Sequence, residues 1–276
     1  MRHRIESLLP RRRRFLAAAF LCFLLSAAGQ AQTRTPSLDD LLARTSKYVA
    51  GFLDQFSSVK CTEHVLQEKF GENGKVERKA DATFDYLVIL TNAGGELSLD
   101  ESRLAVKEAK AERNPVKKNI SLLVSNGFAT LFLVFHPYYQ AGFDFTDQGE
   151  DLVEGRPLKK IHFQHVRGMR TPTALLLRDK EYPLELAGTA WVEPETGVIV
   201  RMSAGIGAGM EDVGLRALRS EVEYAPAFQD TAKLWWFPRL ATIEVETPRQ
   251  HWRNTHHFTD YKRFSVSTEE TVASQP

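Results

Sequence analysis

The sequence predicts an α+β fold in which antiparallel β-strands make up most of the chain. Three observations lead to this prediction. One amphipathic stretch, Leu38–Val59, has the period of a helix. Most of the chain after Cys61 consists of short alternating runs separated by Gly, Asn, Asp and Pro, the pattern of strands and turns. A single strongly apolar segment near residues 120–135 interrupts these runs, and we expect a second, short helix there.

The first 31 residues have the three zones of a cleavable secretory signal. A basic run ends in Arg11–Arg14, an apolar run extends from Phe15 to Ala28, and small residues lead to a cleavage site after Ala31. The apolar run is about 14 residues long, short of the ~20 needed to span a bilayer, so a retained membrane anchor is the weaker alternative. The pattern predicts a periplasmic or secreted protein, and the arginine pairs leave general and twin-arginine export both open.

Charge and cysteine content limit the function classes. The whole chain has a net charge of +1, but residues 1–31 hold six Arg and one Glu, which leaves 30 basic and 34 acidic residues and a net charge of −4. Nucleic-acid binding needs a basic surface, so no nucleic-acid partner is expected. Cys61 is the only cysteine after residue 31, and a domain of this size folds without disulfides. We expect Cys61 to be a small core residue, with an intermolecular disulfide as the alternative.

The helix predicted over Leu38–Val59 has apolar and aromatic residues at spacings of three and four. Ser37 with Asp40 three residues later forms a plausible N-cap, and the acid also suits the helix dipole. The polar face carries charges of both signs without a basic stripe. We therefore expect this helix to pack on the rest of the domain and not on a membrane surface.

The first half of the β-rich region contains a hairpin, a charged segment and the apolar segment. Gly71–Gly74 separates Glu63–Phe70 from Val76–Leu90 and predicts the hairpin. Asp100–Asn114 is densely charged and is interpreted as a solvated loop or short helix. Phe128–Phe135 has apolar residues on every side, which predicts a short helix surrounded by protein.

The second half is strand-like almost to its end. Glu193–Gly197 is a turn that joins Leu186–Val192 to Val198–Ala204 as a hairpin. The glycine-rich stretch Ser203–Gly214 predicts a mobile loop. Further strands are expected at Leu215–Tyr224, Leu240–Thr247, Trp252–Phe258 and Tyr261–Val266, followed by a flexible tail over residues 267–276. No linker or repeat divides residues 32–276, which predicts a single domain.

Two short motifs carry a family resemblance. In Gly188–Arg201 an aromatic-led strand meets a Pro-x-x-Gly turn, and Phe258–Phe264 has the aromatic pattern of a closing strand. With these motifs the chain resembles the periplasmic lipoprotein-carrier superfamily of LolA type over about Leu38 to Val266, and it is most similar to exported bacterial proteins of unknown function. The resemblance implies a curved, incomplete β-barrel (a half-barrel) wrapped around the N-terminal helix and the inserted apolar helix, with an apolar groove for acyl chains. The chain departs from the carriers in Asp100–Asn114 and in Gly205–Gly214, which leaves the cargo open.

No catalytic, metal or cofactor signature stands out. On a strand, His162 and His165 point to opposite faces, and the adjacent His256 and His257 also diverge, whereas a zinc site needs three or four converging ligands. The chain has no Gly-x-Ser-x-Gly motif. Gly205–Gly209 lacks the spacing of a phosphate-binding loop. We therefore expect no catalytic residues, no metal and no cofactor, and a hydrolase or metalloenzyme is the weakest of three hypotheses.

The leading hypothesis is a non-enzymatic, exported cell-envelope protein that binds a hydrophobic ligand, a lipid or an acylated peptide. Apolar and aromatic side chains line such pockets, although the same side chains also fill ordinary cores. The residues predicted to line a cavity between the curved sheet and the helices are Leu131, Phe132, Phe135, Trp191 and Trp252. The alternative is an envelope interaction or sensor module that meets a protein partner through the outer sheet face or the glycine-rich loop. The sequence leaves the oligomeric state open.

Overall fold

The fold was analysed in a computed structural model of the chain. The structure describes residues 36–56, 59–93, 96–105, 127, 131–177, 180–227 and 234–263. The predicted signal peptide (1–31), the predicted tail (267–276) and the first three residues of the apolar run at 128–135 lie outside this part of the chain. Ser37–Pro276 forms one compact unit.

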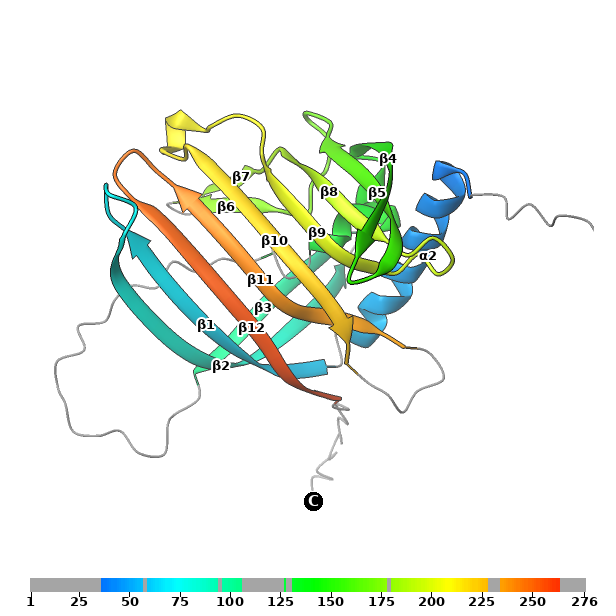
Figure 1. The fold of residues 1–276 in the computed structure, drawn as a ribbon, viewed down its shortest axis with the longest axis horizontal. Coiled ribbons are helices and arrows are strands. Elements are labelled where there is room, and N and C mark those ends of the chain that lie inside the picture. Colours follow the sequence, from blue (N-terminus) through cyan, green and yellow to red (C-terminus); the bar gives the residue numbers. More distant parts are fainter. Residues whose placement is uncertain are drawn as a thin grey trace, which may run out of the picture. The chain divides into compact units, whose positions relative to one another are not determined.

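One curved sheet of ten antiparallel strands dominates this unit (Figure 1). The strand order is β3-β2-β1-β12-β11-β10-β9-β8-β5-β4, so β3 and β4 are its two edges and the sheet does not close on itself. Its strands are β1 (Val59–Phe70), β2 (Val76–Ala93), β3 (Glu96–Ala105), β4 (Phe143–Val153), β5 (Arg156–His165), β8 (Leu186–Val192), β9 (Ile199–Ile206), β10 (Ala217–Pro226), β11 (Trp236–Glu246) and β12 (His251–Arg263). A second, two-stranded sheet pairs β6 (Ala174–Leu177) with β7 (Lys180–Pro183). The mostly antiparallel fold class is confirmed, and the open curved sheet agrees with a half-barrel.

In the described part of the chain, three helical segments accompany the sheet. They are α2 (Leu38–Phe56), the 3-10 helix η2 (Leu131–Phe135) and α3 (Pro137–Gln140); a fourth, η3 (Glu211–Val213), lies between β9 and β10. The predicted N-cap of α2 is confirmed, because the Asp40 N–H donates to Ser37 Oγ and the Ser37 hydroxyl donates to the Asp40 carboxylate at 2.8 Å. No helix among the described residues combines the length and the apolar character needed to cross a membrane.

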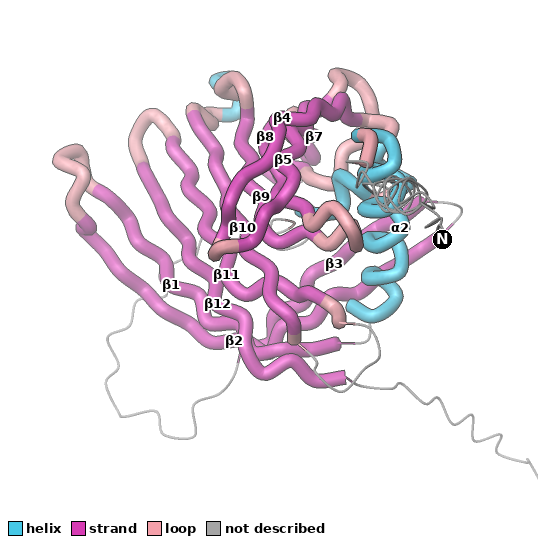
Figure 2. The backbone as a smooth tube through the Cα atoms, turned by 45° about the vertical axis from the view of Figure 1, so that its right-hand side comes forward, coloured by secondary structure: helices cyan, strands magenta, loops and turns pink. Residues whose placement is uncertain are grey.

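The two faces of the ten-stranded sheet differ. We call the face contacted by α2 and η2 the inner face, and the opposite one the outer face. Figure 2 shows α2 to one side of the sheet, while the hairpin ends of β1–β2 and β11–β12 extend away from it. Buried apolar residues of the inner face include Ile161, Phe163, Ala190, Met202, Val222, Ala241, Ile243 and Phe258. The core therefore lies between the inner face and the helical segments.

Aromatic rings join the helices to this face. Phe52 of α2 lies 4.9 Å from the ring of Phe132 in η2 and 4.9 Å from that of Phe237 in β11, both edge-on. Phe135 contacts Phe163 of β5 at 6.3 Å between ring centroids. Edge-to-face pairs at such separations contribute more to stability than the burial of their apolar surface alone.

Four sequence interpretations are corrected by the structure. Val59 begins β1 and does not end the helix. Residues 100–105 of the charged Asp100–Asn114 segment form part of β3 and not a loop or short helix. Arg103 pairs with Glu63 of β1, and Glu101 binds Arg103 and the Gly127 N–H. Ser203–Ile206, expected in a mobile loop, belongs to β9, which pairs with β8 and β10.

The fourth correction concerns the last strand. The stretch expected to form two strands, Trp252–Phe258 and Tyr261–Val266, lies within a single strand β12 as far as Arg263, where the described residues end. Asp260 adopts a left-handed conformation with φ of +54° inside it. The register between β1 and β12 shifts at this point, between Lys60 and Thr62, but the strand continues.

Candidate functional site

Three of the five predicted lining residues lie together in the core. Leu131, Phe132 and Phe135 are all in η2, and each is at most 3% exposed. Phe132 also packs edge-on against Tyr224 of β10 at 6.0 Å, and Phe135 contacts Phe145 of β4 at 5.2 Å. η2 therefore fills part of the space in front of the inner face.

Trp252 lies on the same face of the sheet, nearer its rim. It alternates with the buried residues Asn254 and His256 along β12, and its partner across the ladder is Val245 of β11. Both Trp252 and Val245 are half-buried. The indole N–H of Trp252 donates to Gln250 Oε1 at 2.9 Å, and the Lys69 ammonium lies 6.0 Å from the ring centroid.

Trp191 lies on the outer face. Its neighbours Ala190 and Val192 are fully buried, so the alternation of β8 points Trp191 away from η2. The indole N–H donates to Asp151 Oδ2 at 2.9 Å, and this hydrogen bond lowers the pKa of the Asp151 carboxyl. The Arg201 guanidinium stacks on the ring at 4.9 Å. The structure thus places Trp191 apart from the other four residues.

A buried ionic network occupies the inner face of β1, β3 and β12. Glu63 accepts two hydrogen bonds from the Arg103 guanidinium, at 2.6 and 2.9 Å, and contacts His256 Nδ1 at 2.8 Å. Arg103 also donates to Glu101 at 2.9 Å, and the other oxygen of Glu101 accepts the Gly127 N–H at 2.7 Å. The side chains of Glu63 and Glu101 are 0% and 2% exposed.

The network shifts the pKa values of Glu63 and Glu101 in opposite directions. Burial alone raises the pKa of Glu63, but hydrogen bonds from His256 and Arg103 outweigh it and lower the pKa. Burial dominates for Glu101, whose pKa is raised despite Arg103 and the Gly127 N–H. Burial also raises the pKa of Tyr86, whose ring lies 5.1 Å from the Arg103 guanidinium carbon. Every charge of the network faces an opposite charge or a hydrogen-bond donor.

Sequence reasoning missed this network, although one signal was available. Cys61, Glu63, Val65 and Gln67 occupy the buried phase of β1, so a carboxylate stands where an apolar side chain is the rule. Such a residue needs an opposite charge on a neighbouring strand. The sequence does not show that Arg103, 40 residues later, supplies it.

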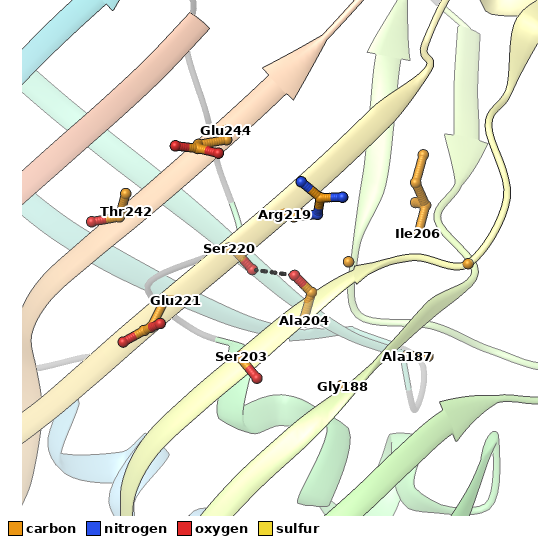
Figure 3. Close-up of a pocket in the computed structure, with 12 residues that line it drawn as sticks. Ala187, Gly188, Ser203, Ala204, Ile206, Arg219, Ser220, Glu221, Thr242 and Glu244 are labelled. Atoms are coloured by element: carbon orange, nitrogen blue, oxygen red, sulfur yellow. Dashed lines mark hydrogen bonds between the residues drawn. The ribbon is translucent and has the colours of Figure 1, made fainter.

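A groove of about 640 Å³ opens on the outer face (Figure 3). It spans β8 to β11, and the residues that line it are Ala187, Gly188, Ser203, Ala204, Gly205, Ile206, Gly207, Arg219, Ser220, Glu221, Thr242 and Glu244. A second cavity of about 500 Å³ shares Ala187, Ile206 and Gly207 with it and continues to Gln164 and His165. The groove therefore runs across the strands.

The side chains that could act as nucleophiles or metal ligands lie apart from one another. His165 is buried and its Nε2 contacts the carbonyl of Met169 at 3.0 Å, whereas His162 lies on the other face, as predicted for a strand. Among the residues that the structure describes, no three His, Cys, Asp or Glu side chains are placed to hold one metal ion. Burial raises the pKa of Cys61 to about 12, which makes this thiol a poor nucleophile at neutral pH.

Comparison with known proteins finds no matching family model and no matching curated protein. Several solved structures are similar to the chain, among them the following three. A LolA superfamily protein from Nitrosomonas europaea is 8% identical, with 84% of this chain and 96% of that chain covered and a TM-score of 0.40. A DUF1329 family protein from Desulfovibrio piger is 14% identical, with 83% and 95% covered and a TM-score of 0.42. A putative outer membrane lipoprotein-sorting protein domain from Vibrio parahaemolyticus is 8% identical, with 83% and 95% covered and a TM-score of 0.38.

Proposed function

We propose that this chain is an exported, non-enzymatic binding protein that holds a hydrophobic ligand against the inner face of its sheet. The observation that carries the proposal is the continuity of the apolar inner face from the core to the rim. Leu218, Ile243 and Val222 are buried, and the same face continues to Val245 and Trp252, which are half-buried and accessible to solvent. An apolar ligand that enters at this rim meets Val245, Ile243 and Ala241 of β11 in turn, with the buried Ser220 and Asn254 on the neighbouring strands.

The pairing of charges in the ionic network favours a ligand whose main part is uncharged. Its charges lie on the same face as Phe258 and Val65, but each of them has a compensating partner. Paired charges do not require a counter-ion from a ligand, whereas an uncompensated buried charge would. We therefore infer that apolar contact, and not ion pairing, supplies the affinity at this face.

The experiment uses N-phenyl-1-naphthylamine, an uncharged probe that fluoresces in apolar surroundings. We expect saturable uptake by the wild-type protein. Trp252→Ala should weaken binding by about tenfold, because it removes on the order of 1–2 kcal/mol of apolar contact at the rim. Mass spectrometry of organic extracts from the purified protein should show copurified lipid or acylated peptide.

Trp191→Ala is the matched control. Both tryptophans are half-buried, both donate the indole N–H to a side-chain oxygen, and both have a cation near the ring. Only Trp252 lies on the inner face, so Trp191→Ala should leave probe binding unchanged. A loss with Trp191→Ala alone would move the site to the outer face. Failure of the wild-type protein to take up any probe, together with extracts free of lipid, would rule out the function.

A further inference from the structure

The outer groove has a transverse floor that the strand register defines. Gln164 of β5, Ala187 of β8, Gly205 of β9 and Arg219 of β10 are successive cross-strand partners. Neighbouring strands lie about 4.8 Å apart, so the row from Gln164 to Arg219 spans about 14 Å. Between its ends, the row carries only the methyl group of Ala187 and the hydrogen side chain of Gly205. The floor is therefore long, narrow and shallow.

The glycines of the groove are not all required by the fold. A Cβ on Gly188 would collide with the main-chain carbonyl of Ser203, and one on Gly205 would lie 2.7 Å from the carbonyl oxygen of Leu218. At Gly207 a Cβ would meet nothing within 4 Å, and Gly207 is not among the glycines with positive φ. Neither packing nor backbone conformation requires glycine there, although glycine costs conformational entropy on folding. A glycine in open space at the junction of two cavities leaves room for a bound molecule.

The charges along the groove leave one cation available. Glu221 is paired with Arg201 at 2.6 Å, and Glu244 with Arg253 at 2.5 Å. Arg219 is exposed, and in the described part of the chain it has no ion-pair partner. Its Cγ lies 3.6 Å from the position of a Cβ on Gly205, so its stem lies against the glycine floor. A guanidinium in this setting can bind carboxylate or phosphate through two hydrogen bonds.

The far end of the groove is polar. Gln164 of β5 is exposed on the outer face, opposite Ala187, and lines the second cavity. The neighbouring His165 follows the phase of Ile161 and Phe163, so its side chain lies on the inner face and takes no part in the groove.

We propose that the outer groove binds an elongated amphiphile with one anionic end group. The carboxylate or phosphate sits on the Arg219 guanidinium, and the apolar body crosses Gly205 and Ala187 toward Gln164. This site is on the opposite face of the sheet from the inner-face site proposed above and does not depend on it.

Isothermal titration with decanoate and decyl phosphate tests the site and separates the two sources of the anion. We expect saturable binding of one ligand per chain for at least one of them, and much weaker binding of decanol and decyltrimethylammonium. Arg219→Gln should weaken binding of the anion by about tenfold or more, because the substitution removes a charge-assisted hydrogen bond. Gly207→Val should also weaken binding, because its side chain enters the groove while the open space around Gly207 tolerates it in the fold.

Arg216→Gln is the matched control, since Arg216 is also exposed and precedes the same strand but does not line the groove. It should bind the anion as the wild type does. Equal binding by Arg219→Gln, equal binding of the cationic probe, or no saturable binding of either anion would overturn the proposal. Decanoate that displaces N-phenyl-1-naphthylamine and depends on Trp252 would place the anion on the inner face, which overturns this site and leaves the proposed function intact.

Discussion

Glu63 and Glu101 contact the same Arg103 guanidinium, yet the fold shifts their pKa values in opposite directions. Glu63 receives hydrogen bonds from two side chains on two strands, Arg103 and His256. Glu101 has one side-chain partner and one main-chain donor, which do not offset its burial. The two carboxylates therefore differ in what their charge contributes to stability.

We predict that Glu63→Gln destabilises the fold more than Glu101→Gln does at neutral pH. The first change breaks a buried bidentate ion pair and should cost about 3 kcal/mol. The second removes a charge that the fold already disfavours and should cost about 1 kcal/mol or less. Urea unfolding of the two variants and the wild type measures both values. Equal losses would mean that Arg103 does not distinguish the two partners.

The pH dependence of stability should follow from the same pair. The ionised form of Glu63 is favoured in the fold, so its contribution is complete above its ordinary pKa of 4.5 and is lost as pH falls through the lower folded-state pKa. We predict that the stability gap between wild type and Glu63→Gln narrows as pH decreases from about 7 to about 3. Urea midpoints across that range measure the gap, and a constant gap would contradict the prediction.

The contribution of Glu101 to stability should depend on pH with the opposite sign. Its raised pKa means that its contribution is present below the ordinary value and is lost as pH rises through the folded-state pKa. We predict that the Glu101→Gln variant gains stability relative to the wild type as pH increases over the same range. A relative loss on raising pH would show that the charged form of Glu101 is the one the fold favours.

At the scale of elements, the β8–β9 turn is fitted to α2. Arg44 Nη1 donates to the carbonyl of Pro194 at 2.5 Å. Gly197 has φ of +74°, and a Cβ on it would lie 2.7 Å from the main chain of Arg44 and Thr45. Only glycine allows both the left-handed conformation and this close approach.

We predict that Gly197→Ala costs about 3 kcal/mol, from left-handed strain together with the collision against α2. Gly74→Ala is the matched control, because Gly74 has φ of +72° in the β1–β2 turn and nothing lies within 4 Å of its Cβ position. It should cost only about 1 kcal/mol. Thermal or urea unfolding distinguishes the two. Losses of equal size would show that the turn moves away from the helix at little cost.

The elements that the sequence predicted well are those with local signals. The helix α2, with its Ser37 cap, and the hairpins at Gly71–Gly74 and Glu193–Gly197 depend on residues a few positions apart. β3 could not be predicted in this way, because the charges of Glu101 and Arg103 suggest solvent until the Arg103 partner Glu63 on β1 and the Gly127 N–H that Glu101 accepts are known. Long-range pairing decides whether a charged segment is a loop or a strand.

The candidate site was predictable only in part for a similar reason. The apolar run at residues 131–135 predicted burial by its composition, and η2 is buried. The side of the sheet on which a tryptophan lies depends on strand phase. Ala190 and Val192 on either side of Trp191 already indicated an outward side chain, but composition alone grouped it with Trp252. The groove at Gly205 and Gly207 requires the register of four strands and has no signature within any one of them.

For the whole molecule, the export prediction can be tested directly. We predict that the chain produced with residues 1–31 in a Gram-negative host is recovered from the periplasm with Gln32 as its first residue, because cleavage follows the small residue Ala31. Mass spectrometry of the intact protein measures this. Ala31→Arg should leave the uncleaved form, and a wild-type protein that keeps residues 1–31 in the membrane fraction would favour the anchor.

The unclosed sheet also bears on how these molecules behave at high concentration. Main-chain donors and acceptors at an open margin can recruit strands from other chains and start fibrils. The β4 margin carries the exposed acids Asp144, Asp147 and Glu150, and a bulge interrupts its register between the last two. Asp147 and Glu150 lie 3.7 and 3.4 Å from the Lys159 ammonium, so this margin carries charged side chains of both signs. These charges and the irregular backbone disfavour stacking of one molecule on another at this margin. The chain can thus keep its sheet open without polymerising through β4.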